Sequence, residues 1–163
     1  MTTVNFHSLV DRVIKVDRGG PESRTGMLLG AKKDHITLLH EEEGIIYYNT
    51  HHIKSLTYNS KDQVEIDVDI PDDFTYIKAK DFRGILEKLT LRWVKINRGG
   101  PETLEGVMDV VTDDFVTIVA NEEIVRVSMF HIRNISYGIK VDKKNKCKES
   151  DNGKGDCGKE KGK

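Results

Sequence analysis

The sequence has few of the residues that would mark a disulfide-rich or membrane-spanning protein. It contains only two cysteines, Cys147 and Cys157, and both lie beyond residue 138, so disulfides cannot hold the rest of the chain together. No apolar run approaches the roughly 20 residues that a membrane-spanning helix needs. The first residues, 1–5, also lack the basic and apolar stretches of a secretory signal. We therefore expect neither a membrane protein nor an exported one.

Net charge is also nearly absent. Lys and Arg number 26 and Asp and Glu 27, which gives a net charge of −1, so no overall field draws the chain to nucleic acid or to an anionic surface. The charge is unevenly spread, because residues 139–163 carry 9 lysines against 5 acidic residues. Hydrophobic residues make up 37% of the 163 residues, below the roughly 45–50% of an average protein. We expect one compact domain or two very small ones.

What the sequence does contain is an internal duplication. The segment Arg18-Gly19-Gly20-Pro21-Glu22 recurs 80 residues later as Arg98-Gly99-Gly100-Pro101-Glu102. A one-residue shortening then changes the offset to 79, at which Ile45 matches Ile124 and Tyr58 matches Tyr137. The repeat covers about fifty residues.

Each copy has the pattern of short β-strands. Ile14 and Val16 alternate with polar residues, and Ile36 and Leu38 flank Thr37, which is the period of two that is typical of half-buried strands. The Gly-Gly-Pro-Glu segment favours a tight hairpin turn between the first two strands. Five short strands in about fifty residues predict an all-β fold of two tandem, small SH3-like or Sm-like five-stranded barrels.

A short helix is predicted ahead of each barrel. In the second copy, Phe82, Ile85, Leu86 and Leu89 fall on one helical face, and residues 5–10 are a weaker version in the first. The segment 59–80 is acidic, and its apolar residues alternate from 64 to 70, so it either links the repeats or adds a strand. The tail has almost no apolar residue, and we expect it to be disordered. The predicted division is 1–58 for the first barrel repeat, 59–80 for the acidic linker, 81–138 for the helix and second barrel repeat, and 139–163 for the Lys-rich tail.

The search for catalytic or metal-binding residues finds no constellation. Of six histidines only His52 and His131 occupy matched positions, and a hydrogen bond from the imidazole to backbone at a strand-entry turn is favoured over a general base or a ligand. The two cysteines lack the paired spacing of a zinc site. We therefore predict no enzyme, no metal and no cofactor.

The doubled turn has two interpretations. In the structural one, Arg18 pairs with Glu22 across one hairpin and Arg98 with Glu102 across the other. In the other, both turns are loops that contact a partner protein or a second copy of the chain. The candidate partner-binding residues are therefore Arg18, Gly19, Gly20, Pro21, Glu22, Arg98, Gly99, Gly100, Pro101 and Glu102. Cys147 and Cys157 are candidates for intermolecular disulfides.

An Sm-like nucleic-acid-binding module is the alternative function. Tyr47 and Tyr48 are of the type that stacks on nucleobases. The second copy has Arg126 and Val127 at those positions and the body is acidic, so packing of the tyrosines is favoured and nucleic acid is not expected as a partner. The Asp-Asn pair of the Sm uridine pocket is also missing, because Asp34 is not followed by an asparagine.

The combined motifs are more specific than any of them alone. They comprise the doubled turn, Asp34-His35-Ile36, Ile45-Ile46-Tyr47-Tyr48, His52-Ile53-Lys54-Ser55-Leu56, Trp93-Val94-Lys95-Ile96-Asn97 and Phe130-His131-Ile132. Over roughly residues 4–138 the chain resembles the spore coat protein B family of endospore-forming bacilli. The resemblance implies a non-enzymatic structural protein of the outer spore coat, made in the mother-cell cytoplasm. It also implies other coat proteins as partners, whereas a second copy of the chain is suggested only by the doubled turn.

Overall fold

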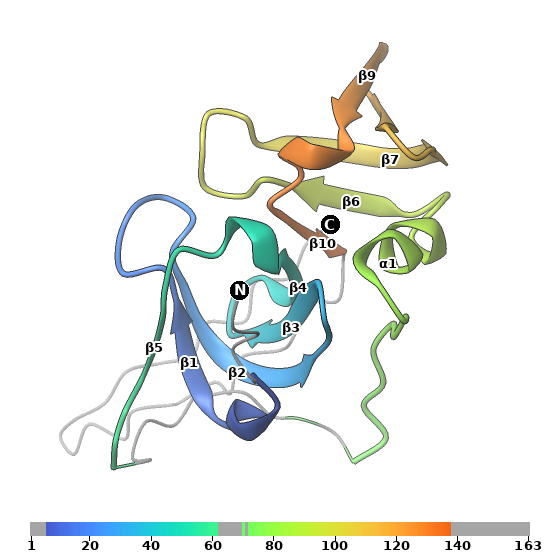
Figure 1. Cartoon of the computed structure of the whole chain (residues 1–163). Helices are drawn as coiled ribbons and strands as arrows, with labels where there is room; N and C mark the ends of the chain where they lie inside the picture. The colour runs from blue at the N-terminus through green and yellow to red at the C-terminus, as the bar shows by residue number, and fades with distance from the viewer. Residues whose placement is uncertain (1–5, 62–69, 71, 138–163) are drawn as a thin grey trace, which may run out of the picture.

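The computed structural model describes residues 6–61, 70 and 72–137. The first repeat contributes η1 (Phe6–Leu9), β1 (Val13–Val16), β2 (Arg24–Ala31), β3 (His35–His40), β4 (Gly44–Asn49), η2 (Thr50–His52) and β5 (Leu56–Tyr58). The second contributes α1 (Phe82–Lys88), β6 (Trp93–Ile96), β7 (Leu104–Val111), β8 (Phe115–Ala120), β9 (Glu123–Ser128), η3 (Met129–His131) and β10 (Asn134–Tyr137). The described strands form one antiparallel sheet in the order β5-β1-β2-β3-β4-β10-β6-β7-β8-β9 (Figure 1). The prediction of a mainly β fold is confirmed.

The two repeats share details of backbone as well as sequence. Asp17 and Asn97 occupy matched positions at the end of the first strand, and both have positive φ, 54° and 51°. The second strand of each copy is irregular at the same place, between Leu28 and Gly30 in β2 and between Met108 and Val110 in β7. The duplication therefore extends to conformation.

The predicted helix before the second repeat is present. Asp81 caps α1 by accepting a hydrogen bond of 2.7 Å from the backbone N–H of Gly84. Phe82, Ile85 and Leu86 are buried, as the one-sided apolar pattern predicts. The first repeat begins with only a single 3₁₀ turn, η1.

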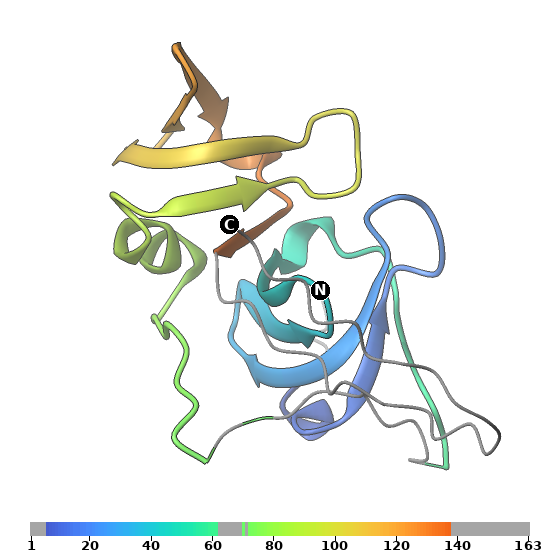
Figure 2. The same cartoon turned by 180° about the vertical axis from the view of Figure 1, so that it is seen from behind.

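The two separate five-stranded barrels predicted from the sequence are not confirmed. Each repeat has the strand order expected for such a barrel, with its last strand beside its first. However, β4 pairs with β10 of the other repeat instead of turning back on its own repeat. The backbone groups on the outer edge of β4 are thereby satisfied between repeats. The result is one open sheet in which the β4–β10 pair joins the two halves, with β5 and β9 as its edges (Figures 1 and 2).

Two hydrophobic cores lie on opposite faces of β3 and β4. Ile46 and Tyr48 of β4 point into the core of the first repeat. Ile45 and Tyr47, which alternate with them, point into a second core that also contains α1 and the inner face of the second repeat. Strand β4 is therefore buried on both faces, whereas β9, its counterpart, is largely exposed. This two-sided burial fastens the second repeat to the first.

Part of the linker packs onto this structure. Phe74, Tyr76 and Ile77 contact the second core, and the Tyr76 hydroxyl donates to the carbonyl of Leu29 at 3.1 Å. The strand suggested for residues 64–70 falls outside the described residues except for residue 70, and the predicted disordered tail with both cysteines lies outside them as well. The predicted domain boundaries stay predictions. In the described ranges, none of the helices has the length and hydropathy needed to cross a membrane.

Candidate interaction surface at the junction of the repeats

The pairing of β4 with β10, which we call the junction, is an antiparallel ladder. Asn134 lies opposite Tyr48 and Ser136 opposite Ile46. One further backbone hydrogen bond extends the ladder beyond this pair: the N–H of Asn49 donates to the carbonyl of Arg133 at 2.9 Å. A strand pair of this kind is formed mainly by backbone groups, so its partner strand is selected by the contacts around it.

The two Arg-Gly-Gly-Pro-Glu turns meet at the junction. Gly99 of the second turn packs directly against the backbone of Pro21 in the first. Although their sequences are the same, the turns differ in conformation, because positive φ occurs at Gly20 in the first turn and at Gly99 in the second. Arg18 and Gly19 in the first turn are exposed. Parts of the two turns thus contact each other, and other parts are open to solvent.

Glu43, in the turn between β3 and β4, is the centre of an ion-pair cluster. It accepts two hydrogen bonds of 3.1 Å from Arg24 of its own repeat, and Arg98 of the second repeat lies 3.3 Å from it. Burial acts to raise the pKa of Glu43, but the hydrogen bond from Arg24 and the positive charge of Arg98 outweigh it and lower the pKa. The cluster favours the ionised carboxylate at neutral pH.

A second ion pair crosses the junction in the same sense, with its acidic residue in the first repeat and its arginine in the second. Arg133, just before β10, lies 2.8 Å from Glu22 of the first turn. Arg98 also donates to the Ser136 hydroxyl at 2.6 Å. Of the charged residues singled out in the turns, Glu22 and Arg98 therefore bind between repeats, where the structural interpretation placed the pairs within each hairpin. Arg18 and Glu102 are exposed.

Sequence reasoning found Glu22 and Arg98 but missed Glu43, Arg24 and Arg133. One signal was present, because Arg24 corresponds to Leu104 in a turn that is otherwise closely repeated. A charge that only one copy retains indicates a contact that only one copy makes.

The matched histidines also lie near the junction. His52 Nε2 donates to the carbonyl of Phe130 at 2.6 Å, and the His52 and Phe130 rings meet edge to face at 5.4 Å. His131 is exposed, and its carbonyl accepts from the Asn97 side chain at 3.0 Å. His52 thus bonds backbone, but the backbone belongs to the other repeat.

Tyr47 and Tyr48 are not placed to stack on nucleobases. Their side chains are 0% and 4% exposed. The Tyr47 hydroxyl donates to the carbonyl of Ile77 at 2.7 Å, and its ring stacks on that of Tyr137 at 6.1 Å. Burial raises the pKa of both phenols above the ordinary value of 10.0. Both tyrosines are core residues.

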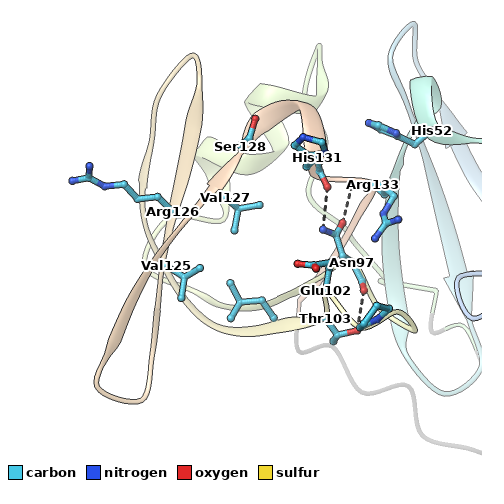
Figure 3. A pocket seen from close by; sticks show the side chains of 12 residues that line it. His52, Asn97, Glu102, Thr103, Val125, Arg126, Val127, Ser128, His131 and Arg133 are labelled. Carbon is cyan, nitrogen blue, oxygen red and sulfur yellow. Dashed lines mark hydrogen bonds between the residues drawn. The ribbon is translucent and has the colours of Figure 1, made fainter.

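The second repeat has a hollow at the position that is equivalent, in the first repeat, to the site of the junction contacts. This hollow of about 640 Å³, which we call the β9 hollow, lies between β9 and the second turn. Val125 and Val127 point toward it and Arg126 points away (Figure 3). Its lining is His52, Asn97, Pro101, Glu102, Thr103, Leu104, Val125, Arg126, Val127, Ser128, His131 and Arg133. In the described part of the chain, no group of three or more His, Cys, Asp or Glu side chains could hold a metal ion.

Comparison with known proteins gives one clear relative. No family model and no solved structure matches the chain. Spore coat protein B of Bacillus subtilis (strain 168) is 39% identical to it over 140 residues. The match covers 83% of this chain and 36% of that protein, so the chain spans about a third of its relative's length. An alignment of this length takes in most of both repeats. The chain belongs to the spore coat protein B family.

Proposed function

We propose that the chain is a non-enzymatic structural protein that assembles with other proteins of the spore coat through its two repeats. The observation that carries the proposal is the 39% identity to spore coat protein B across most of the chain. Membership of this family locates the chain in the spore coat. Synthesis in the mother-cell cytoplasm, and the identity of its partners, belong to the proposal.

The exposed surface of the second repeat supports an assembly role. Two large apolar side chains of this repeat are open to solvent and available to a partner: Ile124 is 71% exposed and Phe130 70%, both in the β9–η3 segment. The open parts of the doubled turn, Arg18 in one copy and Glu102 in the other, add charges that select a partner. Cys147 and Cys157 would then fix the assembled chain through disulfides.

The alternative of a nucleic-acid-binding module has no observation in its favour. Its strongest candidates, Tyr47 and Tyr48, are buried, and the net charge of −1 provides no general attraction to phosphate. We therefore retain the structural function alone.

Fractionation of spores tests the proposal. Mature spores of the organism that makes this chain are extracted with detergent, with and without reductant, and each fraction is probed with an antibody to residues 6–137. Recovery in the coat fraction, and more of it with reductant, is the expected result. Presence in vegetative cytoplasm together with absence from spores would contradict the proposal.

A variant tests the contact role of the first turn. Arg18 is exposed, so Arg18→Ala leaves the fold intact and, under the proposal, lowers the amount of chain in the coat. Lys32→Ala removes an exposed charge between β2 and β3 and is the matched control. Unchanged incorporation of the folded Arg18→Ala protein would remove the turn from the contact surface.

A further inference from the structure

The two edges of the sheet are counterparts of the two strands that form the junction. In the repeat, β4 of the first copy corresponds to β9 of the second, and β10 corresponds to β5. The junction joins the fourth strand of copy one to the fifth strand of copy two. The fourth strand of copy two and the fifth strand of copy one are left as the edges, at opposite ends of the sheet (Figure 1).

We propose that a second copy of this chain adds its β5 to β9 and repeats the junction between molecules. The pairing deepens the proposed function, on which it rests for its setting in the spore coat, by naming a partner and a surface. By the register of the junction, Leu56 of one molecule lies opposite Arg126 of the next and Thr57 opposite Val125. Addition of a strand to a free edge is a common mode of protein association.

The first requirement is that β5 has the conformation of β10, and the same hydrogen bonds hold both strands. The side chain of Asn97 accepts from the backbone N–H of Arg133 at 2.8 Å. In the first repeat, Asp17 accepts from the N–H of the matched Lys54 at the same distance. Each strand also pairs with the first strand of its own repeat, β5 with β1 and β10 with β6. Strand β5 is therefore already shaped as a junction strand.

The second requirement is that the charges at the two edges match. When each residue of the two junction ion pairs is replaced by its counterpart in the other repeat, both pairs still join opposite charges. Arg98 with Glu43 becomes Arg18 with Glu122. The other pair keeps its sign as well, because Arg133 with Glu22 becomes Lys54 with Glu102. All four of these counterparts are exposed in the single chain. Opposite charges at these positions of the two edges favour pairing in this register.

The third requirement is space for the incoming side chains, and each edge has a hollow in the right place. The β9 hollow is the counterpart of the site that receives Gly99 and Arg133 in the first repeat, so it would receive Gly19 and Lys54 of the next molecule (Figure 3). Glu102, which would bind that lysine, is part of its lining.

A hollow beside β5 would in turn receive side chains of β9 from the neighbouring molecule. This second hollow, of about 320 Å³, is lined in part by Phe6, Leu9, Leu56 and Tyr58. Their counterparts in the second repeat, Leu86, Leu89, Ile135 and Tyr137, belong to the core that covers Ile45 and Tyr47 of β4. The side chains that would enter the β5 hollow are thus the counterparts of Ile45 and Tyr47, the exposed Ile124 and Arg126. The guanidinium of Arg12 already lies 5.8 Å from the centroid of the Tyr58 ring, and Arg126 would pack beside this pair.

The pairing is head to tail, because it joins two different edges. Every added molecule offers a new β9 edge, so the assembly grows until it closes into a ring or continues as a filament. The open filament would give a coat protein a means of forming an extended structure.

The test uses the purified full chain, kept in reductant so that Cys147 and Cys157 form no disulfides. Sedimentation velocity over a series of concentrations is expected to show species larger than the monomer that increase with concentration. Arg126→Pro is the edge variant. The N–H of Asn49 in β4 points toward β10. N–H directions alternate along a strand, so the N–H of Tyr47, two residues earlier, points the same way. Arg126 is the counterpart of Tyr47 in β9, and its N–H therefore faces the free edge. Its removal spares the β8–β9 ladder and should weaken association at least about tenfold.

Charge reversal tests the register and remains informative if the proline variant does not fold. Glu122→Lys and Arg18→Glu should each weaken self-association, since each places like charges together, and mixing the two variants should restore it. Asp109→Lys, an exposed change of the same charge on β7, is the control and should associate as the unmodified chain does.

Three results would overturn the proposal: a chain that stays monomeric at every concentration, an Arg126→Pro variant that associates normally, or a mixture no stronger than its components. A monomeric chain that is nevertheless found in the coat fraction would leave the proposed function standing without this partner. A chain that associates by these edges but is absent from spores would support the pairing and contradict the proposed function.

Discussion

Gly99 of the second turn has no room for a side chain, because a Cβ there would overlap the carbonyl of Pro21 in the first turn. Its φ of 93° is also one that residues with a side chain rarely adopt. Gly19, the residue that matches it in the other repeat, has no atom within 4 Å of the corresponding Cβ. One glycine is therefore required by the contact between repeats, and its counterpart is not.

Substitution of these two glycines should distinguish the effect of the contact between repeats from the effect of the turn conformation. Gly99→Ala is expected to destabilise the protein by about 2 kcal/mol, since alanine carries both the strain of positive φ and the clash with Pro21. Gly19→Ala should change the free energy of unfolding by less than about 0.5 kcal/mol. Urea denaturation of both variants measures the difference. Equal effects would show that the turns do not meet as described.

Loss of the Glu43 charge should weaken the junction. Glu43→Gln removes the partner of Arg24 and of Arg98 and leaves both guanidinium groups without it, so a loss of about 1–3 kcal/mol is expected in urea denaturation. Glu87→Gln, which removes an exposed i,i+4 partner of Arg83 on α1, is the control and should cost much less.

The same carboxylate predicts a dependence of stability on pH. The pKa of Glu43 is lowered in the folded chain from 4.5, so the unfolded chain takes up its proton first as the pH falls. The stability that Glu43 contributes is present above pH 4.5 and is lost as the pH falls through the folded pKa. Free energies of unfolding measured below pH 4.5 should therefore fall less steeply in Glu43→Gln than in the unmodified protein.

His40 should add a second dependence at higher pH. Its Nδ1 accepts from the backbone N–H groups of Glu42 and Glu43 at 3.1 and 3.2 Å, which only the unprotonated nitrogen can do. Burial lowers the pKa of His40 below 6.5. Its contribution to stability is complete above pH 6.5 and falls as the pH drops toward the folded pKa. His40→Gln, which cannot titrate, should remove that part of the decline, and an unchanged profile would count against the contact.

The buried phenols should resist ionisation. Burial raises the pKa of Tyr47 and Tyr48, so their stabilising effect is complete below pH 10.0 and is lost as the pH rises through the folded pKa. Above pH 10.0, unfolding in urea should increase phenolate absorbance more in the unmodified protein than in Tyr47→Phe. Tyr47→Phe should also cost about 1–2 kcal/mol at neutral pH, because the carbonyl of Ile77 loses its donor.

The local structure could be predicted from the sequence because local patterns determine it. The alternation of Ile14 and Val16 predicted β1, and the spacing of Phe82, Ile85 and Leu86 predicted α1. These patterns depend on which face of an element is buried, and that requirement is the same whatever the element packs against.

The pairing between repeats could not be predicted in the same way. Two copies of a strand carry nearly the same pattern, so periodicity cannot say whether β4 closes on its own repeat or pairs with β10. One signal was in the sequence, because Ile45-Ile46-Tyr47-Tyr48 is a continuous apolar run whereas the matching strand has Arg126 in its middle. A strand that is apolar on both faces is covered on both faces, and the cover is the second repeat.

The most direct measurement of the central claim is the position of the chain in the spore. Immunogold electron microscopy of thin sections, with antibody to residues 6–137, should place the label over the coat, and in Arg126→Pro spores the coat label should be weaker. Label confined to the cytoplasm of vegetative cells, with none over the coat, would contradict the account.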